Sequence, residues 1–397
     1  MRVIVSGGWS YGNIGDEAIA TASIFLLKSF FPDSELIFTS YSPENFQICH
    51  SISARKSVHK LLEDANCTES YEEVIKNPNQ YGLSAFTDML ESGSVFIMSG
   101  GGYFIESSKS LQFLSRLVEI ELAKRAGCKV VLMGQSIGPV FTQADRKRVK
   151  HALDNCTRIY VRDQSTLNYL KSLNDSANIQ FAPDLAVVLP DVIDERKLLM
   201  PGERKNTISI MPAHYSLYQR VDQAEKLPRL CETILRKMSP QSINYKNQLK
   251  RFILQLSKRH KIRFVMSTNW TWDQSFARSL TDGIDRDRYE FVTCRSTEDL
   301  VEKLISTRCL ISTKMHPLII ASSYNVPTIG ISYNYKVDNY MKIINRDRYC
   351  YRIDKINADE MISQVEDIID NPTNFTGQVL RDRVYEMMVD IKDVVEK

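Results

Sequence analysis

The chain has 397 residues, of which 43% are hydrophobic and 25% charged, and its formal net charge is +3. Because this length exceeds what one ordinary hydrophobic core organises, we expect two domains of about 200 residues each. The nearly balanced charge argues against a dedicated nucleic-acid-binding protein. No apolar run approaches the roughly 20 residues that span a bilayer, so any membrane contact is expected to be peripheral.

The eight cysteines are widely spaced and form no C-x-x-C pair. This spacing favours reduced thiols over a disulfide framework or a zinc site, so no bound metal is expected. The sequence enters a strand at residue 2, which predicts that no signal peptide precedes the fold. We therefore expect a cytoplasmic protein, with the inner face of the membrane as an alternative location.

The first half of the chain alternates short β-branched runs with helical patterns. Strands are expected at 2–6, 35–38, 95–99, 129–134 and 158–162, and helices at 16–31, 109–126, 142–155 and 163–173. Short hydrophobic runs of this kind are typical of buried parallel strands in a doubly wound sheet. The stretch 40–94 interrupts the alternation and is interpreted as a helical insertion.

A second series follows the segment 189–206, which contains two prolines, a glycine and a charge run. Strands are expected there at 207–211, 262–267, 289–294, 308–313 and 327–332. The sequence thus predicts an N-terminal domain at 1–200, a C-terminal domain at 201–375 and a final helix at 376–397. Paired α/β domains bind ligands outside the carboxyl ends of their strands, so the site is expected in the cleft between the domains.

Glycine-rich or polar segments follow five of the expected strands. They are GGWSYGNIGDE (7–17), SGGGYF (99–104), GQSIGP (134–139), RDQS (162–165) and TKMHP (313–317). Glycine lets the backbone approach a ligand, and helix starts attract anions. An isolated glycine triplet also fits an ordinary turn, but five such junctions favour a binding site. A phosphate-binding G-x-x-x-x-G-K-[ST] loop and a complete dinucleotide fingerprint are both absent from the sequence.

Several residues at these junctions fit either a structural or a functional role. Asp16 suits either the first turn of a helix or catalysis, and Asp184, in APDLA, suits either a turn cap or a site. Arg162 and Asp163 fit either a site or a local ion pair at the start of a helix, with Asp163 as its N-cap. His316 is one residue into an expected helix, where it is either structural or placed to protonate an anionic substrate.

Further cations flank His316 on the same expected edge of the C-terminal sheet. Lys314 precedes the histidine by two residues, and YNYK (333–336) follows the next strand. A cation and an imidazole at a helix start suit the binding of a phosphorylated substrate. Tyr333 and Lys336 would add a phenol and a second ammonium group to this edge.

Taken together, GNIGDE with its glycine lead-in, GGGYF, GQSIGP, VRDQS, APDLA and TKMHPLIIASSYNVPTIGISYNYK resemble the polysaccharide pyruvyl transferase family. The segments extend from residue 5 to about residue 336 in the family's order. The resemblance implies two Rossmann-like domains of the glycosyltransferase-B type, with the active site in the interdomain cleft. It also implies transfer of the enolpyruvyl group of phosphoenolpyruvate to a sugar, usually as a cyclic pyruvate ketal. Two positions depart from the family: Lys314 stands where many members have arginine, and Ser136 stands in a GQGIGP-like turn.

The resemblance also implies roles for the junction residues. Phosphoenolpyruvate would be held by Arg162, Lys314 and Lys336, His316 would be the general acid, and Asp16 or Asp184 would take the proton of the sugar. The other expected substrate-binding residues are Asn13, Gly15, Gly100, Gly101, Gly102, Gln135 and Tyr333.

The expected partners follow from the same resemblance. Phosphoenolpyruvate is the donor substrate, and no further cofactor is expected. The acceptor would be a glycan or lipid-linked oligosaccharide, a precursor of a cell-surface polysaccharide. The sequence leaves the oligomeric state open.

Two other functions fit the same residues. A nucleotide-sugar-dependent glycosyltransferase of the same architecture would use the basic C-terminal residues to bind a diphosphate. A non-catalytic glycan- or anion-binding relative is favoured only by Lys314.

Overall fold

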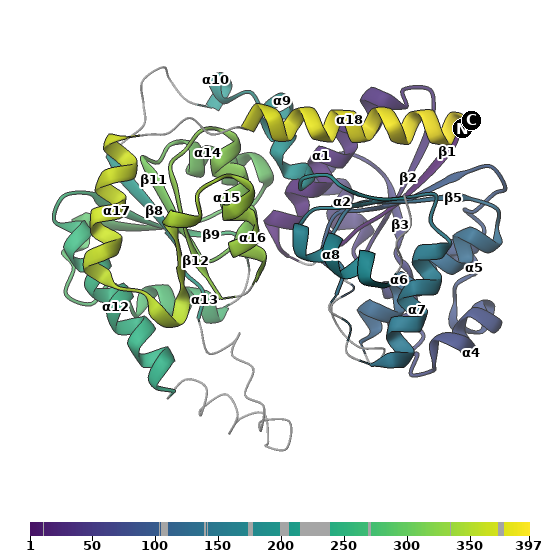
Figure 1. The fold of residues 1–397 in the computed structure, drawn as a ribbon, viewed down its shortest axis with the longest axis horizontal. Coiled ribbons are helices and arrows are strands. Elements are labelled where there is room, and N and C mark those ends of the chain that lie inside the picture. Colours follow the sequence, from purple (N-terminus) through teal and green to yellow (C-terminus); the bar gives the residue numbers. More distant parts are fainter. Residues whose placement is uncertain are drawn as a thin grey trace. The chain divides into compact units, whose positions relative to one another are not determined.

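The computed structural model describes the chain except for residues 11, 103, 105–109, 139, 141, 174–177, 199–205, 215–238, 269–270, 334 and 372–376. It divides into two compact units (Figure 1). Unit 1 contains Met1–Val192 and Gln378–Lys397, and unit 2 contains Ile193–Gly377. From the sequence, the division was expected at residue 200, and the last helix was expected to be separate from both domains. Part of the segment 189–206 lies outside the described residues.

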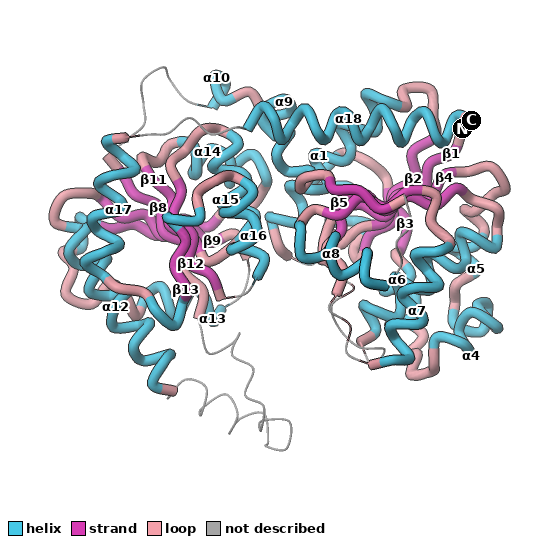
Figure 2. The backbone as a smooth tube through the Cα atoms, in the orientation of Figure 1, coloured by secondary structure: helices cyan, strands magenta, loops and turns pink. Residues whose placement is uncertain are grey.

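Unit 1 is built on a parallel sheet of seven strands in the order β3-β2-β1-β4-β5-β6-β7 (Figure 2). The strands are β1 (Arg2–Ser6), β2 (Glu35–Ser40), β3 (Ala54–Lys56), β4 (Val95–Ser99), β5 (Lys129–Gln135), β6 (Arg158–Val161) and β7 (Ile179–Phe181). The central strands are covered on both faces, and Val3, Ile4 and Val5 of β1 are fully buried. This burial explains why these strands appear in the sequence as short hydrophobic runs.

Helices cover both faces of this sheet. They are α1 (Ile14–Phe30), α2 (Pro43–His50), α3 (Val58–Asp64), α4 (Tyr71–Lys76), α5 (Ser84–Thr87), α6 (Leu111–Arg125), α7 (Gln143–Asp154), α8 (Gln164–Leu173), α9 (Leu189–Val192) and α18 (Gly377–Glu396), with 3-10 helices η1 (Pro78–Tyr81) and η2 (Leu185–Val188). Helix α6 packs against α3, α4 and α7, whereas α1 packs against η2 and α9. Figure 1 shows α6 and α7 on one face of the sheet, and α1 and α18 on the other.

The stretch 40–94, interpreted from sequence as a helical insertion, also contributes a strand to the sheet. Strand β3 pairs in parallel with β2, with Phe38 opposite Ala54. Its residues are Ala-Arg-Lys and are partly or fully exposed, so the hydrophobic signal of a buried strand is missing. The other two strands absent from the expected set, β7 in unit 1 and β13 in unit 2, are likewise three-residue edge strands.

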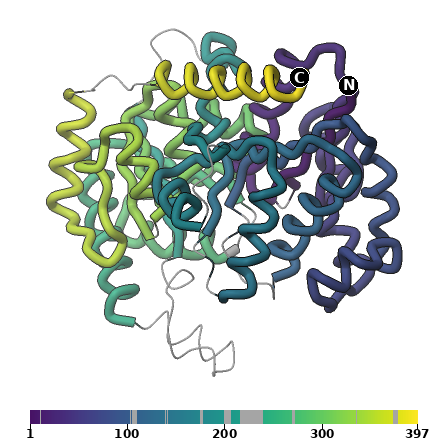
Figure 3. The backbone as a smooth tube through the Cα atoms, turned by 45° about the vertical axis from the view of Figure 1, so that its right-hand side comes forward, coloured from purple at the N-terminus to yellow at the C-terminus, as the bar shows by residue number. Residues whose placement is uncertain are grey.

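Helix α18 returns the end of the chain to unit 1. Lys129 Nζ donates to the carbonyls of Val394 at 3.3 Å and Val395 at 3.1 Å, near the last turn of the helix. Arg158 Nε lies 3.0 Å from Asp390 Oδ2. Figures 1 and 3 both show the two chain termini close together on this unit. A cation at a helix carboxyl end is favourable, which helps to hold α18 against unit 1.

Unit 2 has a second parallel sheet, with six strands in the order β10-β9-β8-β11-β12-β13. The strands are β8 (Thr207–Met211), β9 (Lys261–Met266), β10 (Tyr289–Thr293), β11 (Cys309–Ser312), β12 (Thr328–Ser332) and β13 (Cys350–Arg352). The helices are α10 (Glu195–Leu198), α12 (Pro240–Ser257), α13 (Thr271–Arg278), α14 (Thr297–Ile305), α15 (Met315–Ser323), α16 (Tyr335–Ile343) and α17 (Ala358–Asp370), with 3-10 helices η5 (Arg286–Arg288), η6 (Asp347–Tyr349) and η7 (Ile353–Lys355). Helix α12 packs against α17, and α15 packs against α14 and α16.

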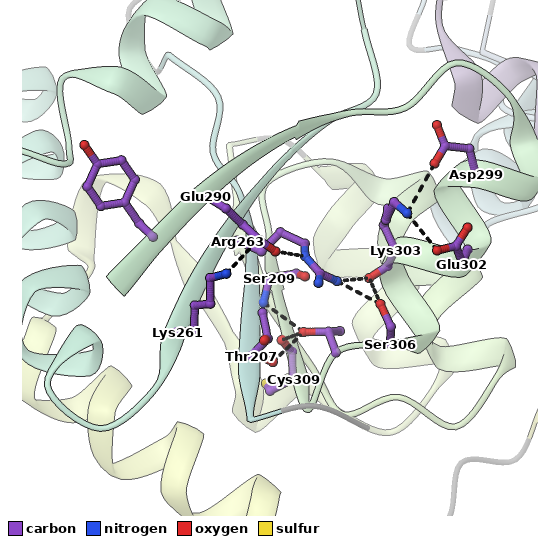
Figure 4. A network of polar contacts seen from close by, with 12 residues as sticks. Thr207, Ser209, Lys261, Arg263, Glu290, Asp299, Glu302, Lys303, Ser306 and Cys309 are labelled. Carbon is purple, nitrogen blue, oxygen red and sulfur yellow. Dashed lines mark hydrogen bonds and ion pairs between the residues drawn. The ribbon is translucent and has the colours of Figure 1, made fainter. Parts of the chain in front are cut away.

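A polar network stabilises the amino-terminal edge of the unit 2 sheet (Figure 4). The buried Arg263 donates through Nε to Glu290 Oε1 at 2.7 Å and through Nη1 to Ser306 Oγ at 2.8 Å. Thr307 Oγ1 donates to the carbonyl of Thr207, the first residue of β8, at 2.8 Å. The network satisfies polar groups where α14 ends and β8 and β11 begin, so its role is structural.

Within the described residues, the helices, the possible metal ligands and the cysteines have the following properties. No helix in the described residues is long and apolar enough to cross a membrane. These residues contain no group of three or more His, Cys, Asp and Glu side chains that could hold a metal ion. Seven cysteines fall within them, and all seven are free thiols.

Candidate functional site

The predicted site residues of unit 1 follow five strands that are consecutive in the sheet. Helix α1 follows β1, the Gly100–Gly102 turn follows β4, Gln135 ends β5, Arg162 follows β6 and Asp184 follows β7. Parallel strands have their carboxyl ends at one edge, so these residues share that edge of unit 1. Of the five junctions singled out in the sequence, four lie on unit 1 and TKMHP lies on unit 2.

The start of α1 separates the roles of its two acidic residues. Asn13 is the N-cap: its Oδ1 accepts from Gly15 N at 3.1 Å, and its Nδ2 donates to Asp16 Oδ2 at 2.9 Å. Asp16 is held in this way while staying partly exposed. Glu17 is buried, accepts from the amide of Ser10 and lies 2.8 Å from His50 Nε2. Asp16 is therefore partly exposed at the edge, whereas Glu17 holds the preceding loop.

The turn after β4 needs its glycines. Gly100 and Gly101 have φ values of +57° and +98°, a region that other residues rarely adopt. A Cβ on Gly100 would lie 2.4 Å from Ile19 Cγ2 of α1. Gln135 is fully buried, and its Nε2 donates to the carbonyl of Gly100 at 2.6 Å. Its Oε1 has no hydrogen-bond partner among the described residues.

We expect Gly100→Ala to lower the free energy of unfolding by about 2–4 kcal/mol, because left-handed strain adds to overpacking against Ile19. Gly82→Ala is the matched control, since Gly82 has a φ of +73° and nothing within 4 Å of an added Cβ. The control should lose only about 1–2 kcal/mol from backbone strain. Urea unfolding of both variants measures the difference, and equal losses would contradict the close contact with α1.

Arg162 and Asp184 form a buried ion pair at the ends of β6 and β7. Arg162 Nη1 lies 2.5 Å from Asp184 Oδ2, and each side chain is only 4% exposed. The other carboxylate oxygen of Asp184 accepts from Ala186 N at 3.0 Å, which caps η2. Arg162 is therefore paired with Asp184, whereas its sequence neighbour Asp163 accepts from Thr166 N at 2.8 Å in the first turn of α8.

Ser136, one of the two departures from the family, takes part in the same cluster. Its hydroxyl accepts from Arg162 Nε at 2.9 Å and donates to Asp163 Oδ2 at 2.8 Å. A glycine could make neither contact. The serine thus orients the arginine and joins β5 to the start of α8.

In unit 2, the predicted residues lie at the carboxyl ends of the neighbouring strands β11 and β12. Lys314 is the N-cap residue of α15, and His316 is the second residue of that helix. Tyr333 follows β12, and Lys336 is in the first turn of α16. All four side chains are partly exposed. The structure therefore brings an imidazole and two ammonium groups to the starts of two adjacent helices.

Lys314 has partners that the sequence did not indicate. Its Nζ lies 2.7 Å from Asp273 Oδ2 and donates to Thr268 Oγ1 at 3.1 Å. Asp273 is 2% exposed in this pair. In the sequence, an acidic residue in the first turn of a helix looks like an ordinary helix-dipole partner, so nothing singled out Asp273.

A second group missed from sequence lies behind the β1 junction. The fully buried Arg116 of α6 donates to Ser6 Oγ and Glu119 Oε2, and its Nη2 donates to the Gly7 carbonyl at 3.0 Å. This side chain fixes the point where β1 leaves the sheet. In the sequence, this group could have been recognised from Arg116 and Glu119, which are opposite charges at positions i and i+3 on the buried face of a helix.

Arg116 also affects a nearby histidine. Burial and the charge of Arg116 lower the pKa of His59 to about 4, so that imidazole is neutral near pH 7.

Solved structures with a similar fold include UDP-N-acetylglucosamine 2-epimerases. The enzyme from Neisseria meningitidis, bound to UDP-GlcNAc, has a TM-score of 0.59 and 10% identity, covering 97% of this chain and 100% of that chain. The enzyme from Rickettsia bellii has a TM-score of 0.56 and 13% identity, covering 100% and 98%. The enzyme from Methanocaldococcus jannaschii has a TM-score of 0.56 and 10% identity, covering 97% and 100%. The protein has a glycosyltransferase-B-like fold of two Rossmann-like units, and identities this low establish the fold alone.

The chain belongs to the polysaccharide pyruvyl transferase family, whose sequence model matches residues 13–335. The matched range contains every predicted site residue except Lys336, which follows it directly. A search of curated proteins finds no match to this chain. Family membership identifies a transferase with a polysaccharide or glycan acceptor.

Proposed function

We propose that the protein transfers the enolpyruvyl group of phosphoenolpyruvate to a sugar of a cell-surface polysaccharide or its precursor, and closes a pyruvate ketal. The observation that carries this proposal is the group formed by Lys314, His316 and Lys336 at two adjacent helix starts of unit 2. Cations and helix N-termini suit an anionic donor, and a partly exposed imidazole suits proton transfer. No cofactor beyond the donor is proposed.

The donor is assigned to unit 2 on grounds of charge. Phosphoenolpyruvate carries a carboxylate and a phosphate, which suit Lys314, Lys336 and the amides at the starts of α15 and α16. Tyr333 supplies a phenol at the same edge. Arg162 in unit 1 is only 4% exposed in its pair with Asp184, so it presents little surface to an anion, whereas the Lys314 side chain is 15% exposed.

The acceptor is assigned to the carboxyl edge of unit 1. Asn13, Asp16 and the Gly100–Gly102 turn offer amide, carboxylate and backbone groups suited to sugar hydroxyls. Asp16 is the better base of the two candidates, because it is partly exposed whereas Asp184 is buried against Arg162. Asp184 then contributes by holding Arg162.

The proposed chemistry gives each of these residues one role. His316 donates a proton to the methylene carbon of phosphoenolpyruvate, which leaves a cationic centre at C2. The first sugar hydroxyl adds to C2 and gives its proton to Asp16. The bond between C2 and the phosphate oxygen then breaks, and inorganic phosphate leaves with the proton of the first hydroxyl. A second hydroxyl adds to C2 and loses its proton, which completes the ketal and balances the proton supplied at the start.

The test is incubation of the full chain with phosphoenolpyruvate and a panel of glycan precursors. We expect phosphate release together with a product heavier by one pyruvyl unit, with or without EDTA. UDP-sugars, offered as donors in parallel, test the glycosyltransferase alternative. Thermal stabilisation by phosphoenolpyruvate without turnover on any acceptor would point to the non-catalytic relative.

A further inference from the structure

The carboxylate of Asp273 connects three neighbouring strand ends in unit 2. Its Oδ2 lies 2.7 Å from Lys314 Nζ, after β11, and its Oδ1 accepts from His214 N, after β8, at 3.3 Å. Asp273 itself lies in α13, the helix that follows β9. Strands β9, β8 and β11 are consecutive in the sheet. One buried side chain therefore fixes the relative positions of three segments at this edge.

The Lys314 ammonium has two fixed partners. Its nitrogen lies 2.7 Å from Asp273 Oδ2, which is a close ion pair. Thr268 Oγ1 accepts from the same ammonium at 3.1 Å. The carboxylate is 2% exposed and the lysine side chain 15% exposed, so the carboxylate lies on the protein side of the pair.

These contacts compensate for the flexibility of a lysine at this position. An arginine grips an anion with a planar fork, whereas lysine is a point charge on a flexible four-carbon chain. Without fixed partners, the Lys314 ammonium would lose conformational entropy each time it bound a ligand. Asp273 and Thr268 hold the ammonium in place beforehand. An incoming anion does not have to displace Asp273, because that carboxylate is 2% exposed whereas the lysine side chain is 15% exposed.

We propose that Asp273 is a positioning residue of the anion site: it holds the Lys314 ammonium and the chain after β8 in the arrangement that binds the donor. The proposal rests on the proposed function for the identity of the donor, phosphoenolpyruvate. Asp273 acts through Lys314 and does not itself contact the substrate.

The test compares Asp273→Asn, which keeps the shape and removes the charge, with Asp282→Asn. Asp282 is the matched control, because its pair with Lys250 is on the surface and its side chain is 83% exposed. We expect Asp273→Asn to raise the dissociation constant and the KM of phosphoenolpyruvate about tenfold or more, by analogy with the loss of a group that orients a metal ligand. We expect kcat to change far less, and Asp282→Asn to match the wild type.

A double variant separates positioning from general damage. Lys314→Met combined with Asp273→Asn should bind phosphoenolpyruvate no more weakly than Lys314→Met alone, because Asp273 acts through the lysine. Additive losses in the double variant, or an unchanged or tighter dissociation constant in Asp273→Asn, would overturn the proposal.

Binding is measured by calorimetry with phosphoenolpyruvate and with inorganic phosphate, independently of turnover. If the wild type binds these anions but forms no product, the proposed function fails while the binding constants still test Asp273. If the wild type binds neither anion, both proposals fail. If product forms and Asp273→Asn behaves as wild type, only the role of Asp273 is refuted.

Discussion

His316→Gln is expected to lower turnover by about 10²–10⁴, the usual contribution of a positioned acid–base group, with little change in affinity for phosphoenolpyruvate. The residue is the second of α15 and partly exposed, and the buried Pro317 follows it, a residue suited to a first helical turn. Glutamine keeps a polar side chain of similar length but cannot donate a proton as an acid. Steady-state kinetics and calorimetric titration of the purified variant separate the two effects.

The matched control is His260→Gln, in the same unit but at the amino end of β9, where His260 Nδ1 lies 2.7 Å from Asn206 Oδ1. This variant should turn over at nearly the wild-type rate. Near-normal turnover of a folded His316→Gln protein would remove His316 from the mechanism and make Asp16 the next residue to test.

The sequence predicted the central part of each sheet because strands that are buried on both faces consist mainly of hydrophobic residues. Strands β1, β4 and β5 are covered on both faces and read as uninterrupted hydrophobic runs. The edge strands β3, β7 and β13 have three residues each and no such trace. The attachment of α18 to unit 1 depends on contacts such as Arg158 with Asp390, 232 residues apart in the sequence. No local pattern encodes a contact of this kind.

In the candidate site, too, local features could be predicted from the sequence, whereas contacts between distant residues could not. Glycine turns and helix starts next to strands are local features, so the sequence placed Gly100 and His316 at strand ends, as the structure has them. The partner of a site residue comes from another element, as Asp273 does for Lys314. Asp184 was found as a candidate residue, but its pairing with Arg162 could be seen only when β6 and β7 were placed side by side.

That buried pair leads to the second large expected effect. Arg162→Met should lower the free energy of unfolding by about 3–5 kcal/mol, because it leaves the Asp184 carboxylate buried without its counter-charge. Adding Asp184→Leu removes the uncompensated charge and should restore most of the loss. The double variant should keep a deficit of about 1 kcal/mol, since the cap that Asp184 provides to Ala186 N is also lost. Urea unfolding of the single and double variants measures these differences.

The control for the same measurement is Asp154→Asn on α7 of unit 1, which breaks the pair between Lys150 and Asp154. Those side chains are 46% and 41% exposed, so water already screens their attraction. The loss should stay within about 1 kcal/mol. If Arg162→Met were no more destabilising than Asp154→Asn, the Arg162–Asp184 pair would not be the buried, charge-balanced contact seen here, and Arg162 would again be available to bind an anionic substrate. A large loss that the double variant relieves would instead assign Arg162 and Asp184 to the support of the unit 1 edge.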